Sequence, residues 1–345
     1  MKSVIFGNPE GSLMSAMTYK AVGVDVARGD RLIRAIKRTA RSTFSRSVLS
    51  DIGAFGAFFS AKFSEYKHPV LVSSIDGVGT KLKVALLLDR HDTVGQDLVN
   101  HCVNDVLVCG AKPLYFLDYF GTGKLRFRVV QQVIGGMVKA CRENGCSLVG
   151  GETAELPGIY RNGEYDLAGA IVGVAEKRDI IDGRGIRRGD VLVGLPSTGL
   201  HTNGYTLARA VLLKRFKPDR YVAEFGCTVG EELLKVHRSY LSSVMAIRRL
   251  YIIQGLSHIT GGGIVGNTRR ILPKGRTIKV DWRSWERPAV FRLIQRFGSV
   301  PEADMRRTFN LGVGLVLVVR ERAADGLLRS LRRLKERPFI LGEVV

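Results

Sequence analysis

One segment carries much of the information about the fold: residues 69–88 read PVLVSSIDGVGTKLKVALLL. Its first seven residues form an apolar run that predicts a strand, and its last eight predict a helix. Between them, Asp76 opens a loop in which Gly77 and Gly79 let the backbone approach a ligand closely. The start of the following helix offers unpaired N–H groups to an anion, and Lys81 adds a positive charge. The P-loop pattern is absent, and a plain glycine turn capped by Asp76 fits the local pattern equally well.

Strands and helices alternate along the rest of the chain, which predicts an α/β (α+β) protein built from two layered units. The charged, glycine-rich residues 176–189 mark the boundary between the units. We therefore expect an N-terminal extension over residues 1–18, a first domain over 19–175 and a second domain over 176–345. One long helix is predicted over 231–250.

The composition is that of a globular protein of about two domains, because the 345 residues are 45% hydrophobic and 25% charged. No apolar run approaches the roughly 18 residues that span a bilayer, and no secretory signal is evident, so a membrane location is not expected. The five cysteines include no CxxC pair. Free thiols of this kind are typical of a reducing compartment, so we expect a cytoplasmic protein.

The net charge is +21, and it is distributed unevenly. Residues 1–175 hold 21 basic and 16 acidic residues, whereas 176–345 hold 32 and 16, so the second half carries +16. Nucleic-acid binding, anionic small substrates and a merely soluble arginine-rich surface would each account for this excess. The basic residues are scattered at helical spacing without interleaved aromatic residues, a pattern that disfavours nucleic acid as a partner.

Acidic side chains recur at the ends of predicted elements or on a buried face. Asp97, His101, Asn104 and Asp105 share one face of the predicted helix 97–109. A polar stripe on a buried helix needs partners, which either a metal or ligand or an interface network would provide. His101 taken alone is better explained as a packed polar residue than as a ligand.

Two further acids, Asp118 and Glu152, lie in or just after apolar strands. Oxygen ligands around a phosphate are what Mg²⁺ requires, so the acids at 76, 105, 118 and 152 predict a magnesium site.

Two donor-rich loops of the second half are candidate anion sites. Residues 197–204 read STGLHTNG and residues 258–263 read HITGGG, and each leads into a predicted helix. Backbone N–H groups at a helix start can hold a phosphate, although ordinary capped turns have the same composition.

Several long motifs together resemble one family. FLDYFGTGKL (116–125), VGGETAELPG (149–158) and GLHTNGY (199–205) are similar to those of the phosphoribosylformylglycinamidine cyclo-ligases, also called AIR synthetases or the PurM family. Shorter matches follow in order from about Tyr19 to the C-terminus, at residues 19–25, 76–81, 90–95, 103–105, 258–263 and 307–310.

The resemblance implies a two-domain PurM-like fold in a homodimer, with an N-terminal ATP-binding and dimerisation domain whose strands pair across the interface and a C-terminal α/β domain. It also implies ATP-dependent ring closure of formylglycinamidine ribonucleotide to 5-aminoimidazole ribonucleotide, with release of ADP and phosphate, in purine biosynthesis. ATP would phosphorylate the formyl amide oxygen before the amidine nitrogen attacks that carbon. The expected cofactors are ATP and Mg²⁺, and the expected partners are nucleotide substrates and a second copy of the chain.

The resemblance also assigns roles to individual residues. The expected catalytic residues are His201, Lys81 and Asp105, with His201 moving a proton or contacting phosphate. The expected metal ligands are Asp76, Asp105, Asp118 and Glu152. The expected ATP-binding residues are Lys37, Gly53, Gly56, Asp76, Gly77, Gly79, Thr80, Lys81 and Asp105. The expected substrate- and phosphate-binding residues are Ser197, Gly199, His201, Asn203, Thr260, Gly261, Gly262 and Gly263.

The chain departs from the family pattern at two places. Residues 50–56 read SDIGAFG, where the family has a loop close to GGxGGFG, so glycines are lost and Asp51 is gained. A Pro-Thr pair expected near 236–237 is Val236-His237. Two alternatives therefore stay open: another ATP-using member of the same superfamily, and a degenerate RNA-binding relative without catalysis.

Overall fold

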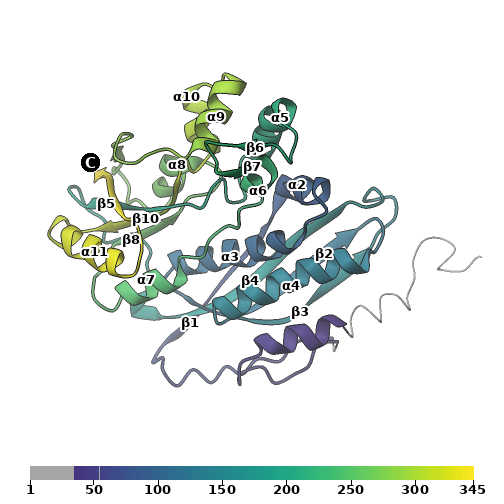
Figure 1. Ribbon diagram of the computed structural model, residues 1–345. Coiled ribbons are helices and arrows are strands. Elements are labelled where there is room, and N and C mark those ends of the chain that lie inside the picture. The colour runs from purple at the N-terminus through teal and green to yellow at the C-terminus, as the bar shows by residue number, and fades with distance from the viewer. Residues whose placement is uncertain (1–34, 54) are drawn as a thin grey trace, which may run out of the picture.

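The computed structural model describes residues 35–53 and 55–345, which form two main β-sheets with helices packed on them (Figure 1). The expected mixture of helices and strands is confirmed. The predicted extension over residues 1–18 lies outside the described residues.

The first sheet has four strands in the order β1-β4-β2-β3. Strands β1 and β2 each pair antiparallel with β4, whereas β2 and β3 are parallel. Helices α3 and α4 cover one face of the sheet (Figure 1). The bounds are β1 Pro69–Gly77, β2 Lys112–Thr122, β3 Ser147–Glu155, β4 Tyr165–Glu176, α3 Asp92–Val108 and α4 Phe127–Glu143.

The opposite face of this sheet keeps apolar side chains in contact with solvent. Ile75 pairs with Ala170, and Ala170 pairs with Leu117, so the three lie in one row across β1, β4 and β2. Ile75 is 72% exposed and Leu117 is 36% exposed, and Leu71, four residues before Ile75 on β1, is 60% exposed. Phe116 and Phe120, on the helix-covered face of β2, are buried. The sheet is therefore apolar on both faces.

The second sheet has five antiparallel strands in the order β8-β10-β5-β11-β9. Its strand β10 is buried along its whole length, as its continuous apolar run requires. Helices α7 and α11 contribute to one apolar cluster on this sheet, and α8 contributes to another. The bounds are β5 Val191–Pro196, β8 Gly255–His258, β9 Ile278–Val280, β10 Val313–Val319, β11 Phe339–Val344, α7 Leu241–Ile247, α8 Gly263–Arg269 and α11 Glu321–Arg333.

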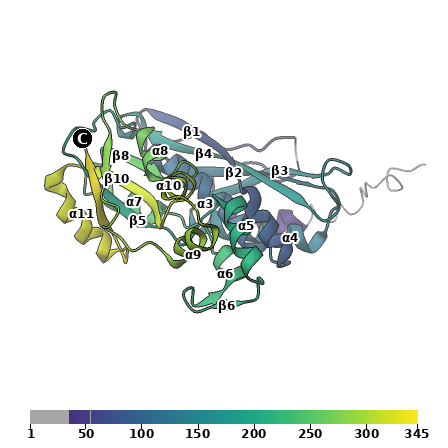
Figure 2. The ribbon, with the colours of Figure 1, turned by 90° about the horizontal axis from the view of Figure 1, so that it is seen from above.

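A continuous apolar core joins the two halves of the chain. Tyr205 and Phe291, from helices of the second half, belong to the same buried cluster as Phe116 and Val99 of the first sheet and α3. The two helices that carry Tyr205 and Phe291 pack against each other (Figure 2). The remaining elements are α2 Leu82–Leu87, α5 Tyr205–Arg215, α6 Val229–Leu233, α9 Ala289–Gly298, α10 Glu302–Thr308 and the hairpin of β6 Tyr221–Val222 and β7 Cys227–Thr228.

The single helix predicted over residues 231–250 is wrong. The chain instead forms α6, which ends at Leu233, and α7, which begins at Leu241. The intervening residues 235–240 are neither helix nor strand, although they include no glycine or proline. Their backbone groups bond to side chains of α3, as described below, and these bonds replace those of a helix.

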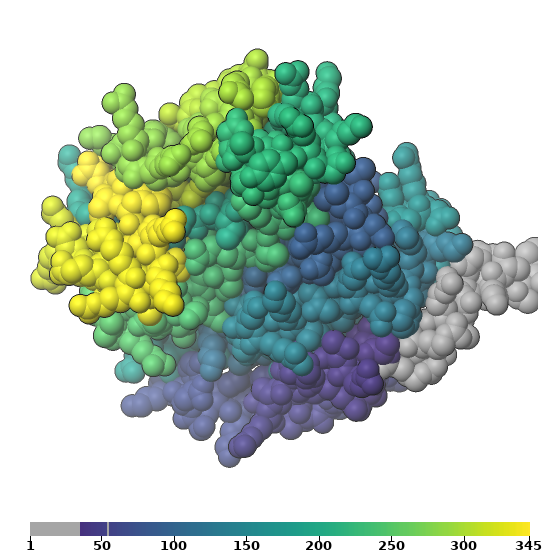
Figure 3. Space-filling model, viewed as in Figure 1, coloured from purple at the N-terminus to yellow at the C-terminus, as the bar shows by residue number. Residues whose placement is uncertain are grey.

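Residues 35–53 lie at one end of the first sheet, where they contact α4 and β3 (Figure 3, purple against teal). Ser147 on β3 donates a hydrogen bond from its hydroxyl to the carbonyl oxygen of Thr43 at 3.0 Å. Within the described part of the chain, none of the helices has the length and apolar character needed to cross a membrane.

Candidate active site

The polar face of α3 lies between the two sheets and serves two purposes. Its first function is to hold residues 235–240. The Asp97 carboxylate accepts a hydrogen bond from the N–H of His237 at 2.7 Å, and Asn100 donates one to the carbonyl of His237 at 2.7 Å. Asn104 donates to the carbonyl of Arg238 at 2.9 Å and accepts from the N–H of Tyr240 at 3.0 Å. Buried backbone groups need such partners. These polar side chains of α3 therefore form a hydrogen-bond network at the interface with residues 235–240.

Lys81 takes part in the same network. Its ammonium lies 2.7 Å from the Asp97 carboxylate and donates a hydrogen bond to the carbonyl of Lys235 at 2.7 Å. Both side chains are fully buried, and burial lowers the pKa of Lys81 and raises the pKa of Asp97. The prediction that Lys81 contacts a phosphate is therefore corrected: its side chain points into the interior, where it joins three segments of the chain.

The second function of the α3 face is to present carboxylates. The Nδ1 of His258 lies 2.8 Å from Asp105 Oδ1, and the Nε2 of His101 lies 2.8 Å from Asp76 Oδ2. Because an ionised carboxylate can only accept, each imidazole nitrogen donates. Although burial alone would raise it, the pKa of Asp105 is held below its ordinary value by His258, and His101 has the same effect on the pKa of Asp76.

Asp76 and Asp105 lie close together, because the Nε2 of His101 is also 3.9 Å from Asp105 Oδ2. Both border a cavity of about 460 Å³, which Thr260 and Arg270 also line. The structure therefore brings together two of the four predicted metal ligands, next to one of the two predicted phosphate loops.

The other two acids border a different cavity, also of about 460 Å³, together with Gly53 and Gly56 of the altered glycine loop. Asp76 and Asp118 pair with the same residue of β4, Gly169, from opposite sides, so a strand separates them. The expectation of one cluster of four acids is corrected: within a single chain, the acids form two pairs.

Asp118 is closely enclosed in this second cavity. A Cβ atom on Gly151 would lie 2.3 Å from Asp118 Oδ1, so the glycine is needed for the close approach of β2 and β3. Burial, with a smaller contribution from the charge of Glu152, raises the pKa of Asp118 to about 7. A cation bound beside it would favour the ionised form.

The acid gained in the glycine loop has cationic partners. Asp51 forms ion pairs with Lys37, at 2.6 Å, and with Arg41. Hydrogen bonds from these two residues lower the pKa of Asp51. Lys37 was expected to reach the nucleotide. In the structure it lies at this loop and forms an ion pair with Asp51.

Four histidines gather at the buried side of the Asp76–Asp105 site. The Nε2 atoms of His237 and His258 are 2.9 Å apart, and the His201 ring stacks on the His237 ring with centroids 3.9 Å apart. Burial lowers the pKa of His201 and of His237 well below the usual range, so both rings are neutral at pH 7. Although His201, His237 and His258 are close enough to share a metal ion, the first two are nearly parallel, at 18°, and their in-plane lone pairs do not converge.

His201 is only 1% exposed, and it has a left-handed backbone with a φ of 62°. Its Nε2 accepts a hydrogen bond from the N–H of Thr198 at 3.2 Å. The expected role in proton transfer or phosphate contact is therefore corrected: the ring is packed under its own loop and holds the loop's shape.

The two predicted phosphate loops lie side by side. A Cβ atom on Gly261 would be 3.4 Å from the side-chain oxygen of Asn203. Asn310 braces the first loop, since its amide donates to the carbonyl of Gly199 at 2.9 Å and accepts from the Ser197 hydroxyl at 3.0 Å.

Among the glycines of the second loop, Gly263 is also required by packing. It has a φ of 67°, and a Cβ atom there would lie 1.8 Å from the carbonyl oxygen of Arg306. The Thr80 hydroxyl lies 3.0 Å from that of Thr206, two residues after the end of the first loop.

No role in this site was predicted from the sequence for His237, which was noted only as a departure from the family pattern, or for Thr202, which was placed only in a donor-rich loop. His237 follows an apolar residue inside a predicted helix, and its sequence neighbours form no motif that indicates a functional histidine. The Thr202 hydroxyl lies 2.8 Å from the Nδ1 of His101 and 3.4 Å from the Nδ1 of His237. Only the contact between the loop, α3 and residues 235–240 reveals both.

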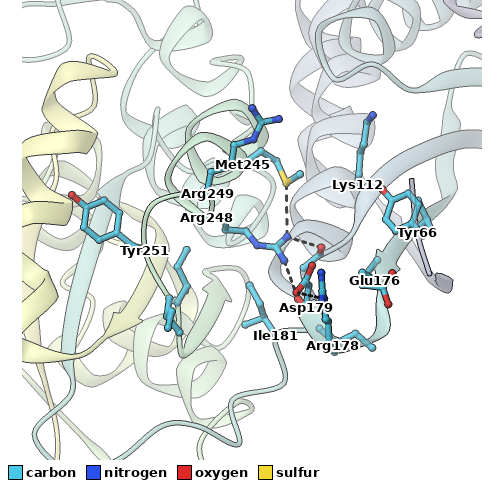
Figure 4. Close-up of a pocket in the computed structure, with 16 residues that line it drawn as sticks. Tyr66, Lys112, Glu176, Arg178, Asp179, Ile181, Met245, Arg248, Arg249 and Tyr251 are labelled. Atoms are coloured by element: carbon cyan, nitrogen blue, oxygen red, sulfur yellow. Dashed lines mark hydrogen bonds and ion pairs between the residues drawn. The ribbon is translucent and has the colours of Figure 1, made fainter. Parts of the chain in front are cut away.

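Another cavity, of about 490 Å³, lies between the end of β4 and the segment that follows α7 (Figure 4). The Arg248 guanidinium crosses it and donates hydrogen bonds to the carbonyls of Gly110, at 2.6 Å, and Asp179, at 2.8 Å. Arg248 thus joins the two halves of the chain, and this cavity has none of the carboxylate–histidine pairs of the site above.

Comparisons with known proteins place this chain in a family. Residues 64–175 match the N-terminal domain of the AIR synthase related protein family, and residues 187–345 match its C-terminal domain. A phosphoribosylformylglycinamidine cyclo-ligase of Sorangium cellulosum is 52% identical over 335 residues, which cover 96% of each chain. One of Anaeromyxobacter sp. (strain Fw109-5) is 52% identical over 319 residues, which cover 91% of this chain and 93% of that one.

Solved structures share the fold at low sequence identity. The E. coli hydrogenase maturation protein HypE has a TM-score of 0.65 at 17% identity, covering 90% of this chain and 91% of its own. A HypE solved in complex with ATP has a TM-score of 0.67 at 18% identity, covering 94% and 88%. Thiamine-monophosphate kinase from Stenotrophomonas maltophilia has a TM-score of 0.63 at 15% identity, covering 94% of both chains.

Proposed function

The chain belongs to the phosphoribosylformylglycinamidine cyclo-ligase family, and from this membership we propose which of its residues bind the reactants. It is a ligase that uses ATP to close formylglycinamidine ribonucleotide into 5-aminoimidazole ribonucleotide, with release of ADP and phosphate, in purine biosynthesis. The sequence-based prediction of this activity is confirmed.

One observation supports the proposed site most directly: Asp76 and Asp105 border the same cavity, and each is held ionised by a histidine. We propose that these carboxylates hold the Mg²⁺ that accompanies ATP. Carboxylate oxygens suit this ion, and both residues retain oxygen lone pairs beyond those that the histidines occupy. When bound, Mg²⁺ would neutralise charge on the transferred phosphoryl group. His101 orients the Asp76 carboxylate and His258 orients the Asp105 carboxylate through these hydrogen bonds.

We propose that the ribonucleotide phosphate binds where the loops 197–204 and 260–263 meet. Arg270 lines the cavity beside Thr260, and its cationic side chain would complement a phosphate. Asn310 and the buried His201 keep the first loop in shape, so that its backbone N–H groups are available to the anion without rearrangement.

The second cavity is proposed to bind part of the nucleotide. Gly53 and Gly56 line it with backbone atoms alone, and Asp118 and Glu152 also border it. A buried carboxyl with a raised pKa beside a second acid is stabilised by a cation, so a metal-bound phosphate is a suitable ligand there. The Asp51 carboxylate is neutralised by Lys37 and Arg41, which limits its repulsion of phosphate.

We propose that the protein is a homodimer that covers the open face of the first sheet. The row of Ile75, Ala170 and Leu117 gives that face an apolar surface that a second copy would bury. A cytoplasmic location is proposed on chemical grounds, because all five cysteines are free thiols, as expected in a reducing compartment.

The activity is tested by supplying formylglycinamidine ribonucleotide, ATP and Mg²⁺ to the purified protein and measuring ADP together with the aminoimidazole product. Release of both that depends on the ribonucleotide is the expected result. ADP release that is independent of the ribonucleotide, or the absence of aminoimidazole product, would contradict the proposal.

A further inference from the structure

Asp105 is the first member of an ordered series of polar contacts that leads away from the cavity. Its Oδ1 is 2.8 Å from His258 Nδ1, and the opposite nitrogen of that ring, Nε2, is 2.9 Å from His237 Nε2. The exposed fraction falls along the series, from 27% for the Asp105 side chain to 6% for His258 and 0% for His237. Both ring nitrogens of His258 are therefore held by protein groups.

The hydrogens of this series can be assigned from the partners. A neutral imidazole carries one N–H, and His258 must donate it from Nδ1 because the Asp105 carboxylate can only accept. The Nε2 of His258 is then an acceptor, so the 2.9 Å contact requires a donor on His237 Nε2. His237 Nδ1 then carries no hydrogen; the Thr202 hydroxyl lies 3.4 Å from it and 2.8 Å from the Nδ1 of His101. The amide nitrogen of Asn104, 3.3 Å from the same Nε2, carries two N–H groups and donates one to the Arg238 carbonyl, so the assignment rests on the shorter contact with His258.

We propose that His237 is a positioning residue for metal binding: its Nε2–H fixes the tautomer and ring plane of His258, and His258 in turn orients the Asp105 carboxylate toward the cavity. The inference rests on the proposed role of Asp105 in holding the metal of MgATP. His237 would thus support the metal ligand through an intermediate residue, His258. His237 lies at one of the two positions, 236–237, where a Pro-Thr pair was expected and the chain has Val236-His237.

The His237 side chain is not what holds residues 235–240 in place, so its effect can be separated from that of the backbone. Asp97 and Asn100 bind the N–H and the carbonyl of residue 237, and neither bond uses the imidazole. The rings of His201 and His101, with centroids 3.9 Å and 5.1 Å from that of His237, pack against the imidazole and limit its motion. Replacement of the ring therefore removes the donor to His258 while the backbone anchors remain.

The test compares Mn²⁺ binding, measured by electron paramagnetic resonance in the presence of ATP, across the full-length wild type, H237V and H237Q. Loss of the donor in H237V is expected to raise the Mn²⁺ dissociation constant by about tenfold. H237Q keeps an amide N–H near His258, so its dissociation constant is expected to lie nearer the wild-type value. The matched control is H91V, which removes another buried histidine whose partners are Tyr165 and Asp89. It should bind Mn²⁺ as the wild type does.

Wild-type Mn²⁺ affinity in H237V would overturn the inference. Nitrogen-15 NMR of the wild-type histidines gives a second measurement that needs no variant: Nδ1–H is expected on His258 and Nε2–H on His237, and an Nε2–H on His258 would overturn the assignment. Failure of the proposed function is distinguishable, because the wild type itself would then bind no Mn²⁺ with ATP and form no aminoimidazole product.

Discussion

The ammonium of Lys81 lies 2.7 Å from the carboxylate of Asp97, and neither side chain reaches solvent. The same ammonium donates to the carbonyl of Lys235, and Asp97 accepts from the N–H of His237, so the pair connects the first helical turn after β1, α3 and residues 235–240. The pair also contacts the backbone of two histidines of the cluster, His201 through Lys81 and His237 through Asp97. The shape of the site therefore depends on an ion pair that is itself out of reach of the substrates.

Substitution K81M is expected to destabilise the protein by about 3–5 kcal/mol, because it leaves the buried Asp97 charge without its partner. Chemical denaturation measures the change in the free energy of unfolding. The double substitution K81M/D97L removes both charges and should recover much of the stability. A K81M protein of wild-type stability with a greatly raised KM for ATP would instead support direct contact of Lys81 with phosphate.

Substitution D105N is expected to lower kcat by about two orders of magnitude or more while leaving the fold intact, since it removes a charge that faces the metal-bound phosphates. Steady-state ADP release and circular dichroism measure the two effects. D92N, at the first residue of the same helix, where the side chain is half exposed, is the matched control and should retain activity. Near-normal kcat in D105N would reject the metal-binding role of Asp105.

The carboxyl of Asp118 is expected to make stability depend on pH in a defined range. Its pKa is about 7 in the folded chain and near its ordinary value of 3.8 when unfolded, so between these values the folded state binds more protons. Stability from this group therefore falls as pH rises from about 4 to about 7 and is constant above that. Urea denaturation of the wild type and of D118N at several pH values isolates the contribution, and parallel curves across this range would contradict it.

Substitution I75D is expected to convert the proposed dimer into a monomer, because it places a charge in the apolar row of the open sheet face. Light scattering coupled to size exclusion measures the mass. I252D changes an exposed isoleucine outside that sheet and should leave the mass unchanged. A wild-type protein that is monomeric at micromolar concentration would refute the proposed interface.

Local sequence patterns were sufficient for much of the fold and for part of the site. The strand, loop and helix at residues 69–88, the buried run of β10 and the polar face of α3 all follow from periodicity and residue type, which act over a few neighbouring positions. The motifs 116–125, 149–158 and 199–205 were enough to identify the family. These features depend on which residues are present and on their spacing, and no distant contact alters them.

Tertiary structure alone decided where the side chains point and which of them meet. The Lys81–Lys235 contact joins residues 154 positions apart, and the bond between His237 and Asp97 joins residues 140 apart. Those contacts turned a predicted phosphate ligand into a buried cation, interrupted the helix predicted over 231–250 and brought His237 to His258. The pairing of β1 and β2 on opposite sides of β4 separates Asp76 from Asp118, so the four acids lie in two cavities. Such outcomes depend on the free energy of burying and pairing charges in the assembled interior, and that energy has no counterpart in the local pattern.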